Sequence, residues 1–323
     1  MHKKLLIAFI LSTFLLQIRG QDPYFSQFFN SILYLNPAYA GSAHQPRISA
    51  AYRNQMPALG SPWVSYNASF DMPVQPLEGG LGINVMSDVQ GPALNRISAD
   101  AMYSYFLAVN SQLTINAGFQ ASYSHRFLNR SALVLPDEVG GQTGSQELIG
   151  DMNKGYPDFA IGFVGFTRNI YAGVSMHHLT RPNLAMSGGP RQSLARKLTV
   201  HGGMYLSLYE RRLGREALKL NPNLVYLHQG GFRQINYGLD VVYKNIYTGA
   251  WFRHSLDFAV NAFTIHLGYE HDYFRFGYSH DFNVYSPWRN MQNMGAHELT
   301  FLLKLANGRG PRDRFRTIKS PKI

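Results

Sequence analysis

The sequence contains no cysteine and no apolar stretch long enough for a membrane helix, since the apolar run near its start, Leu5 to Leu16, has only 12 residues. Without cysteine the chain has neither disulfide bridges nor a site for a lipid-modified N-terminal cysteine. A transmembrane helix needs about 20 consecutive apolar residues, so a helical membrane protein is excluded. Acidic residues are also few, 19 against 30 Lys and Arg.

The single apolar stretch lies in the opening "MHKKLLIAFILSTFLLQIRG". Lys3 and Lys4 form a positive region, an apolar run follows from Leu5 to Leu16, and Gly20 is a small residue at a cleavage point. This pattern predicts a secretory signal peptide over 1–20. For an exported chain, we expect the basic surplus to meet anionic lipid headgroups or an acidic protein partner, and no nucleic acid.

Alternation with a period of two residues dominates the rest of the chain. In "RQINYGLDVVYK", Ile235, Tyr237 and Leu239 fall on one face and Gln234 and Asn236 on the other, as in a β-strand. Most such segments have about 9–14 residues, whereas a membrane strand needs about 9–11 and globular strands average about 5–6. We count fourteen segments, roughly 48–54, 63–71, 79–87, 96–108, 111–125, 156–167, 169–178, 196–209, 217–228, 232–243, 245–254, 257–270, 273–282 and 296–305.

The connections between these segments alternate in length. Tight ones such as Lys244-Asn245 and His271-Asp272 follow even segments, while the long ones, 126–155, 179–195 and 283–295, follow odd segments. Short periplasmic turns and longer outer loops are typical of outer-membrane barrels. The fold class predicted is therefore all-β, a transmembrane antiparallel β-barrel of about 14 strands of the outer-membrane type. An even strand number places both termini in the periplasm. The alternative is a soluble β-sandwich or a lipocalin-like barrel.

The stretch "QDPYFSQFFNSILYLNPAYAGS" stands between the signal peptide and the barrel. Pro23 and Pro37 forbid one continuous helix between them, although Phe25, Phe28 and Phe29 suit a short amphipathic helix. We expect residues 21–46 to form a plug or a periplasmic lid, residues 47–306 to form the barrel and residues 307–323 to form a tail. A sealing role and a partner-binding role both remain open for the opening segment.

This stretch resembles the start of the PorP/SprF family, outer-membrane proteins of the type IX secretion system of Bacteroidetes. The Asp-Pro-x-Phe/Tyr-Ser-Gln start and the later Leu-Asn-Pro-Ala-Tyr-x-Gly are similar to that family's signature, and "AAYRNQMP" resembles a further motif, with Met56 in place of its usual Trp. "GGLGINVMSDVQGP" and "LGYEHDYFRFGYSHDF" resemble other family segments. The matching positions are Asp22, Pro23, Tyr24, Ser26, Gln27, Phe28, Asn36, Pro37, Ala38, Gly41, Arg53 and Gln55.

The resemblance implies a non-enzymatic role in the secretion or surface anchoring of cargo that carries a C-terminal sorting domain. The implied partners are that cargo, which includes gliding adhesins in some relatives, and periplasmic components of the secretion machinery. The identity of the cargo stays open, as does the choice between a general secretion component and a dedicated adhesin partner. A passive porin or a hydrophobic-substrate channel of the outer membrane is the alternative function.

The twelve histidines do not form a recognisable metal or catalytic motif. His177 and His178 are neighbours in a predicted strand, so they point to opposite faces and cannot share one metal there. No His-Glu-x-x-His spacing occurs, and no nucleophile elbow singles out a serine. We therefore expect no catalytic residue, no cofactor and no metal, with a barrel enzyme as the remotest alternative.

The tail 307–323, "NGRGPRDRFRTIKSPKI", contains six basic residues and one acidic residue. Its glycines and prolines oppose regular structure. We expect a flexible periplasmic segment that is either a solvated end or an electrostatic tether to an acidic periplasmic partner.

Overall fold

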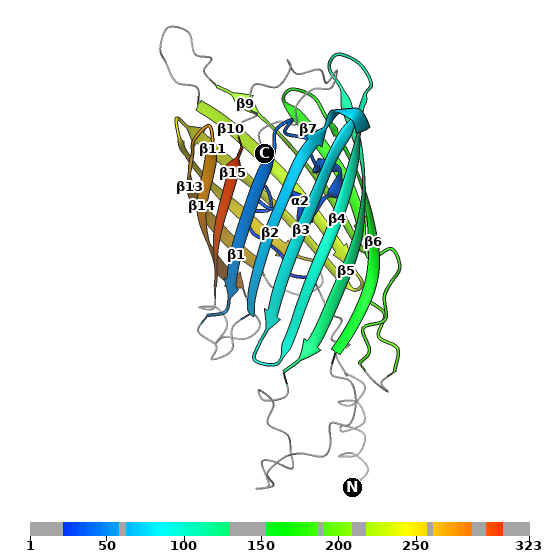
Figure 1. Cartoon of the computed structure of the whole chain (residues 1–323). Coiled ribbons are helices and arrows are strands. Elements are labelled where there is room, and N and C mark those ends of the chain that lie inside the picture. The colour runs from blue at the N-terminus through cyan, green and yellow to red at the C-terminus, as the bar shows by residue number, and fades with distance from the viewer. Residues whose placement is uncertain are drawn as a thin grey trace, which may run out of the picture.

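The computed structural model describes residues 22–57, 63–129, 153–186, 190–208, 218–256, 261–285 and 295–305. Within these ranges the strands form one antiparallel sheet that closes into a barrel (Figure 1), because β1 pairs with β15 along its whole length. The strands are β1 (Arg47–Gln55), β2 (Trp63–Val74), β3 (Gly79–Gln90), β4 (Leu94–Ala108), β5 (Thr114–Leu128), β6 (Asn153–Phe166), β7 (Ile170–His177), β8 (Lys197–Met204), β9 (Leu206–Ser207), β10 (Leu218–Gln229), β11 (Phe232–Tyr243), β12 (Ile246–Ser255), β13 (Asn261–Glu270), β14 (Phe274–Tyr285) and β15 (Ala296–Lys304).

The barrel has fourteen strands, as the sequence predicts. The short β9 continues β8 along the same neighbour, β10, so the two count as one strand. Each predicted segment agrees with a strand to within about four residues at either end, and 232–243 coincides with β11. The alternative of a soluble sandwich is wrong, because a single closed sheet leaves no second sheet to pack against it.

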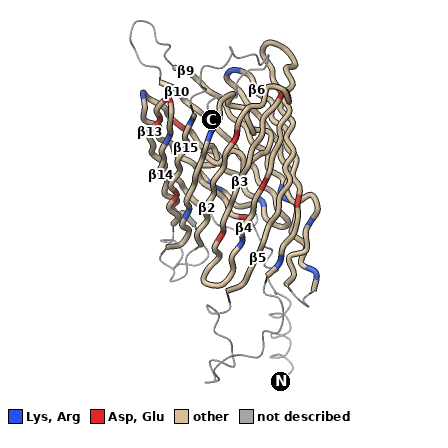
Figure 2. Tube along the Cα trace, in the orientation of Figure 1, with Lys and Arg blue, Asp and Glu red and all other residues tan. Residues whose placement is uncertain are grey.

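The two faces of the strands divide as predicted. Large apolar side chains such as Phe119, Tyr237 and Leu299 are more than two-fifths exposed on the outside of the barrel, while Asn236 and Thr300 are buried inside it. This arrangement suits a wall whose outer surface meets lipid and whose interior is polar. Figure 2 shows the sparse charged residues as short coloured stretches in a mostly tan barrel.

The two rims of the barrel differ in their connections. The rim at which β1 begins and β15 ends lies at the top of Figure 1 and is called the upper rim; the opposite rim is called the lower rim. The upper rim carries short turns such as Lys244-Asn245, and the lower rim carries the connection from β7 to β8. Most of the predicted loop 126–155 and of 283–295 lies outside the described residues.

The N-terminal segment, residues 22–46, lies inside the barrel as far as Gly41 and then leads into β1. It contains one turn of helix, α2 (Ile32–Leu35), and the 3-10 turn η1 (Pro37–Tyr39); a second 3-10 turn, η2 (Gln75–Leu77), joins β2 to β3 at the upper rim. The short amphipathic helix expected between the two prolines is thus limited to one turn. Among the described residues, no helix is long and apolar enough to cross a membrane.

The described chain begins and ends at opposite rims. Asp22 contacts His178 and Lys197, which flank the connection from β7 to β8 at the lower rim. Lys304 ends β15 opposite Arg47 at the upper rim. The expectation that both termini lie on the periplasmic side stays a prediction. Residues 1–20, predicted to be the signal peptide, and the predicted tail 307–323 lie outside them.

Candidate functional site: the N-terminal segment in the barrel interior

The lower end of the N-terminal segment is fixed by a buried charge cluster around Asp22. Its carboxylate accepts hydrogen bonds from Arg96 (2.8 Å) and lies 2.6 Å from Nε2 of His178 and 3.2 Å from Nζ of Lys197. The other ring nitrogen of His178 contacts Asp158 at 2.5 Å. One segment residue thereby joins β4, the end of β7 and β8, and each buried charge in this cluster has an opposite charge beside it, so removing one member would leave another unpaired.

The same cluster shifts the protonation of its members. Burial alone would raise the pKa of Asp22, but the charges of His178, Lys197 and Arg96 outweigh burial and hold that pKa well below its usual value. Burial alone would lower the pKa of His178, but Asp22 and Asp158 raise it above its usual value. These shifts favour the carboxylate form of Asp22 and the imidazolium form of His178.

The next contact is a buried network around Ser26. Its backbone N–H donates to Glu298 (2.6 Å) and its hydroxyl donates to Asp281 (2.8 Å). Arg53 of β1 donates to the Ser26 hydroxyl (2.7 Å) and pairs with Asp281 (2.7 Å) and Glu298 (3.2 Å). The Glu298 carboxylate also accepts the backbone N–H of Gln27 (2.8 Å). This network ties the segment across the seam where β1 closes on β15.

Aromatic residues of the segment flank this network. The guanidinium of Arg253 lies 4.5 Å from the ring centre of Tyr24, a cation–π contact. Burial raises the pKa of Tyr24 to about 12, so its hydroxyl stays protonated. Phe28 meets Trp251 edge to face at 5.0 Å. The two aromatic anchors therefore attach the segment to β12.

The Asn-Pro-Ala turn holds the upper part of the segment. Asn36 caps η1 by accepting the backbone N–H of Ala38 (2.9 Å), and its amide donates to the carbonyls of Phe163 and Val174 at 3.2 Å each. The carbonyl of Ala38 accepts a hydrogen bond from the Ser104 hydroxyl (2.9 Å). Asn and Pro are favoured at such caps, so the local sequence determines the turn and the turn docks onto β4, β6 and β7.

Glycines in the wall make room for this turn. A Cβ on Gly118 of β5 would lie 2.3 Å from the backbone N of Ala38, and one on Gly162 of β6 would lie 2.0 Å from the side-chain oxygen of Asn36. No side chain fits at such distances, so the close approach of the turn to the wall depends on glycine.

The segment leaves the interior at Gly41. This residue has φ +70°, and its N–H donates to Asp71 (2.8 Å), which is also paired with Arg47 (2.8 Å). Glycine adopts this conformation without strain. The glycine that ends the Leu-Asn-Pro-Ala-Tyr-x-Gly motif thus turns the chain from the interior towards β1.

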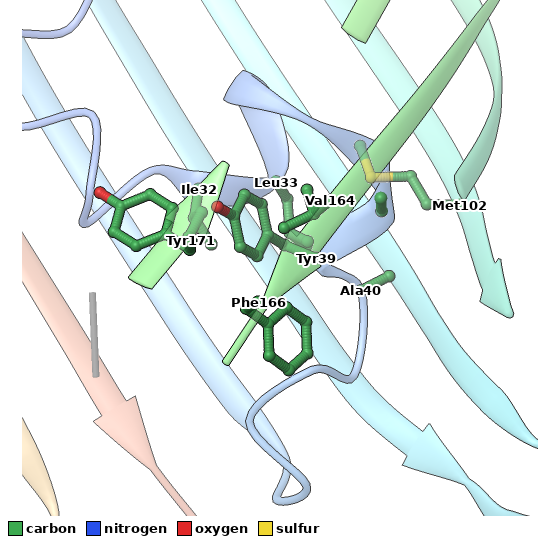
Figure 3. Packing of buried hydrophobic residues seen from close by; sticks show 9 residues of the cluster. Ile32, Leu33, Tyr39, Ala40, Met102, Val164, Phe166 and Tyr171 are labelled. Carbon is green, nitrogen blue, oxygen red and sulfur yellow. The ribbon is translucent and has the colours of Figure 1, made fainter. Parts of the chain in front are cut away.

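Apolar side chains fill the space between these polar anchors. The cluster drawn in Figure 3 joins Ile32, Leu33 and Tyr39 of the segment to Val164 and Phe166 of β6. Phe28, Phe29 and Leu35 pack in a second cluster with β10 and β12. Burying each such side chain is worth about 1.5–3 kcal/mol, so the segment is held by several such contributions in addition to its polar contacts.

Most family-motif positions predicted from the sequence meet at this interface. Asp22, Pro23, Tyr24, Ser26, Gln27, Phe28, Asn36, Pro37, Ala38 and Gly41 lie in the segment, and Arg53 reaches it from β1. The carbonyl of Pro23 accepts a hydrogen bond from Tyr34 (2.7 Å). Gln55 is the exception: it ends β1 opposite Ala296 and Trp63, and within the described chain its side chain makes no hydrogen bond to the segment. The sequence did not single out Asp281, Glu298 or Asp158, because an isolated carboxylate on an inward strand face looks like any other lumen residue.

Among the described residues, no group of three or more His, Cys, Asp or Glu side chains is placed to hold a metal ion. His201 packs against the ring of Tyr39 at 5.5 Å and contacts the amide of Asn36 at 3.2 Å. The polar groups inside the barrel that are in contact with the segment hold the segment in place.

The closed barrel of long strands with an apolar outer face and a polar interior defines an outer-membrane β-barrel protein. A family model described as "Type IX secretion system membrane protein PorP/SprF" matches residues 18–303, and the chain belongs to that family. None of the curated proteins compared matches its sequence.

Solved structures with the same fold are outer-membrane proteins. The toluene transporter TodX of P. putida superposes with a TM-score of 0.53 at 10% identity, covering 86% of this chain and 95% of that chain. The CymD monoaromatic hydrocarbon channel gives a TM-score of 0.50 at 11% identity over 88% and 94%. These likenesses concern the fold and place the chain among outer-membrane barrels.

Proposed function

We propose that this barrel is a non-enzymatic component of the type IX secretion system that holds or helps to export sorting-domain cargo at the cell surface. The observation that carries the proposal is the occupied interior. From Asp22 at the lower rim to Gly41 at the upper rim, the N-terminal segment is joined to the wall by buried ion pairs, hydrogen bonds and apolar clusters. A barrel built in this way serves as an anchor and a docking platform.

The occupied interior argues against the alternative of an open porin or hydrophobic-substrate channel. The apolar cavity between the segment and β8, β10 and β11 has a volume of only about 50 Å³. Small-molecule sites in proteins have volumes of about 300–1,000 Å³. A bound hydrocarbon would therefore require displacement of the segment, whose lower end is held by the Asp22 charge cluster.

In this proposal the upper rim faces the periplasm and the lower rim faces the outside, because the short turns lie at the upper rim. Cargo then binds on the lower rim, where the longer loops lie, and the periplasmic machinery meets the upper rim. The N-terminal segment is a plug whose lower end reaches the outer mouth. The segment, which carries most of the family-motif residues, is packed against the wall from one rim to the other.

The test measures barrel assembly and surface display of cargo in the double variant Tyr24→Ala with Phe28→Ala. These changes remove the contacts to Arg253 and Trp251 and leave every strand intact. We expect a heat-modifiable barrel in the outer membrane and a loss of surface cargo, detected with antibody on intact cells. Phe25→Leu, which keeps an apolar side chain at a buried position, is the matched control. Normal cargo display by the double variant would contradict the proposal, as would steady single-channel conductance of the wild-type barrel in planar bilayers.

A further inference from the structure

At the upper rim the N-terminal segment fills only one side of the barrel. There Gly41 contacts Asp71 of β2, Tyr39 shares a buried cluster with Tyr171 at the start of β7, and His44 packs against Phe106 of β4. On the other side, between the β6–β7 turn and β14, a cavity of about 420 Å³ remains open. It is large enough for a ligand by the usual range of about 300–1,000 Å³.

The cavity has a polar lining in which basic residues outnumber acidic ones. Arg168 comes from the β6–β7 turn, Lys219 from β10, Lys244 from the β11–β12 turn and Arg275 from β14; the acidic residues in the described part of the lining are Glu270 and Asp272. In Figure 2 coloured positions gather at the upper end of the barrel near β10 and β13.

One of the two acidic residues is already neutralised. Glu270 pairs with Arg275 at 3.2 Å and with Lys304, which lies beside the cavity, at 3.1 Å. Arg168 and Lys219 are exposed at the surface. The cavity therefore presents a net positive potential to whatever approaches the upper rim.

The position of the cavity restricts what can bind there. Its lining residues Asn221 and Arg275 are buried inside the barrel, so lipid headgroups outside the wall do not reach it. Its volume corresponds to about a dozen waters at about 30 Å³ each, which is more than one phosphate needs. A short peptide segment with several carboxylates fits both the size and the charge.

We propose that this cavity, which we call the upper-rim vestibule, is a docking site for an acidic segment of a partner protein. This inference deepens the proposed function and rests on it, because the proposed function is what assigns the upper rim to the periplasm, where the secretion machinery lies. The predicted tail, residues 307–323, contains six basic residues and one acidic residue. An acidic segment that binds in the vestibule therefore comes from another protein.

The test uses purified full-length protein in detergent and a fluorescein-labelled hexaglutamate peptide, with binding followed by fluorescence anisotropy. Arg168→Gln with Lys219→Gln removes two exposed charges from the vestibule. We expect binding to weaken roughly threefold to tenfold, since each exposed charge pair contributes a modest amount. Binding should also weaken between 0.1 and 1 M salt, where the Debye length falls from about 10 Å to about 3 Å.

The matched control is Arg181→Gln with Arg191→Gln, which removes the same charge from exposed positions at the lower rim. Equal weakening by this control would overturn the proposal, because only net charge would then matter. It is also overturned if hexaglutamate does not bind, or if inorganic phosphate at the same ionic strength displaces it, which would indicate an adventitious small-anion site. Cargo display in cells is measured separately. If the peptide does not bind but cargo display still depends on the barrel, the docking proposal fails and the proposed function stands.

Discussion

Arg53 of β1 donates a hydrogen bond of 2.7 Å to the hydroxyl of Ser26 in the N-terminal segment. The two residues belong to separate family motifs and meet inside the barrel. Arg53 also pairs with Asp281 and Glu298 on β14 and β15. A single buried guanidinium thus links the segment to the seam that closes the barrel, and this gives the two motifs a shared structural role.

Replacing Arg53 should be severe. In Arg53→Ala, the buried carboxylate of Glu298 loses its arginine partner, while Asp281 keeps Arg253 at 3.1 Å. Removing one member of a buried pair costs about 3–5 kcal/mol. We expect the temperature at which the compact form disappears on semi-native gels to fall markedly. Arg53→Ala with Glu298→Gln should recover part of the loss, because one unpaired charge is removed.

The control for this series is Arg191→Ala, an exposed arginine of the lower rim that should change little. A wild-type transition temperature in Arg53→Ala would show that the network contributes nothing to stability.

A second prediction concerns the glycine that faces the Asn-Pro-Ala turn. In Gly118→Val the new Cβ would lie 2.3 Å from the backbone N of Ala38, so the turn must leave its place. Valine is favoured in strands, so β5 itself should persist. We expect faster proteolysis of the N-terminal segment and higher ion conductance in planar bilayers, with a heat-modifiable barrel retained.

Gly165→Val is the matched change for Gly118→Val. It lies in β6, and a Cβ there meets no atom within 4 Å. Conductance and proteolysis should stay at wild-type levels. If both variants behave alike, the close approach of the turn to the wall is not what keeps the interior closed.

The third prediction is a pH dependence of the lower tether. The pKa of His178 is raised by Asp22 and Asp158 against the effect of burial, so its contribution is fully present below its ordinary value of about 6.5 and is lost as pH rises through the folded value. The pKa of Asp22 is lowered, so its contribution is present above about 3.9 and lost only in stronger acid. Both contribute between these ordinary values.

Hydrogen exchange of the first part of the N-terminal segment measures this effect, after correction for the intrinsic pH dependence of exchange. Protection near pH 5.5 should exceed protection near pH 8.5. His178→Gln should remove the difference, while Arg96 and Lys197 keep Asp22 in place at both values. An unchanged difference in His178→Gln would assign the pH dependence to another group.

The sequence was sufficient for the barrel and insufficient for its interior. Alternation in stretches such as "RQINYGLDVVYK" reports which face meets lipid, because each strand has a period of two whatever its partners are. The interior depends on which inward residues face one another after closure. Ser26, Asp281 and Glu298 are distant in sequence and meet only through the tilt and register of the strands, which one sequence does not state.

The opening segment illustrates the same limit. Its prolines and the Asn36-Pro37 turn were readable as local structure, but plug and periplasmic lid were equally consistent with them. What distinguishes the two is the wall, where Gly118 and Gly162 leave room for the turn. Glycines in strands signal a close approach without saying what approaches.

The last prediction concerns the orientation of the barrel in the outer membrane. Because the chain contains no cysteine, a single introduced cysteine is the one site that a maleimide labels. Ser193 at the lower rim and Ser111 at the upper rim are both exposed, and Ser→Cys is a small change at either site. If the longer loops face outward, a membrane-impermeant maleimide should label Ser193→Cys on intact cells and Ser111→Cys only after the outer membrane is permeabilised. An epitope tag near Gly141, in the predicted loop 126–155, should behave like Ser193→Cys. The unsubstituted protein contains no thiol and must stay unlabelled. The reverse labelling pattern would invert the barrel, placing cargo and the upper-rim vestibule on the sides opposite to those proposed.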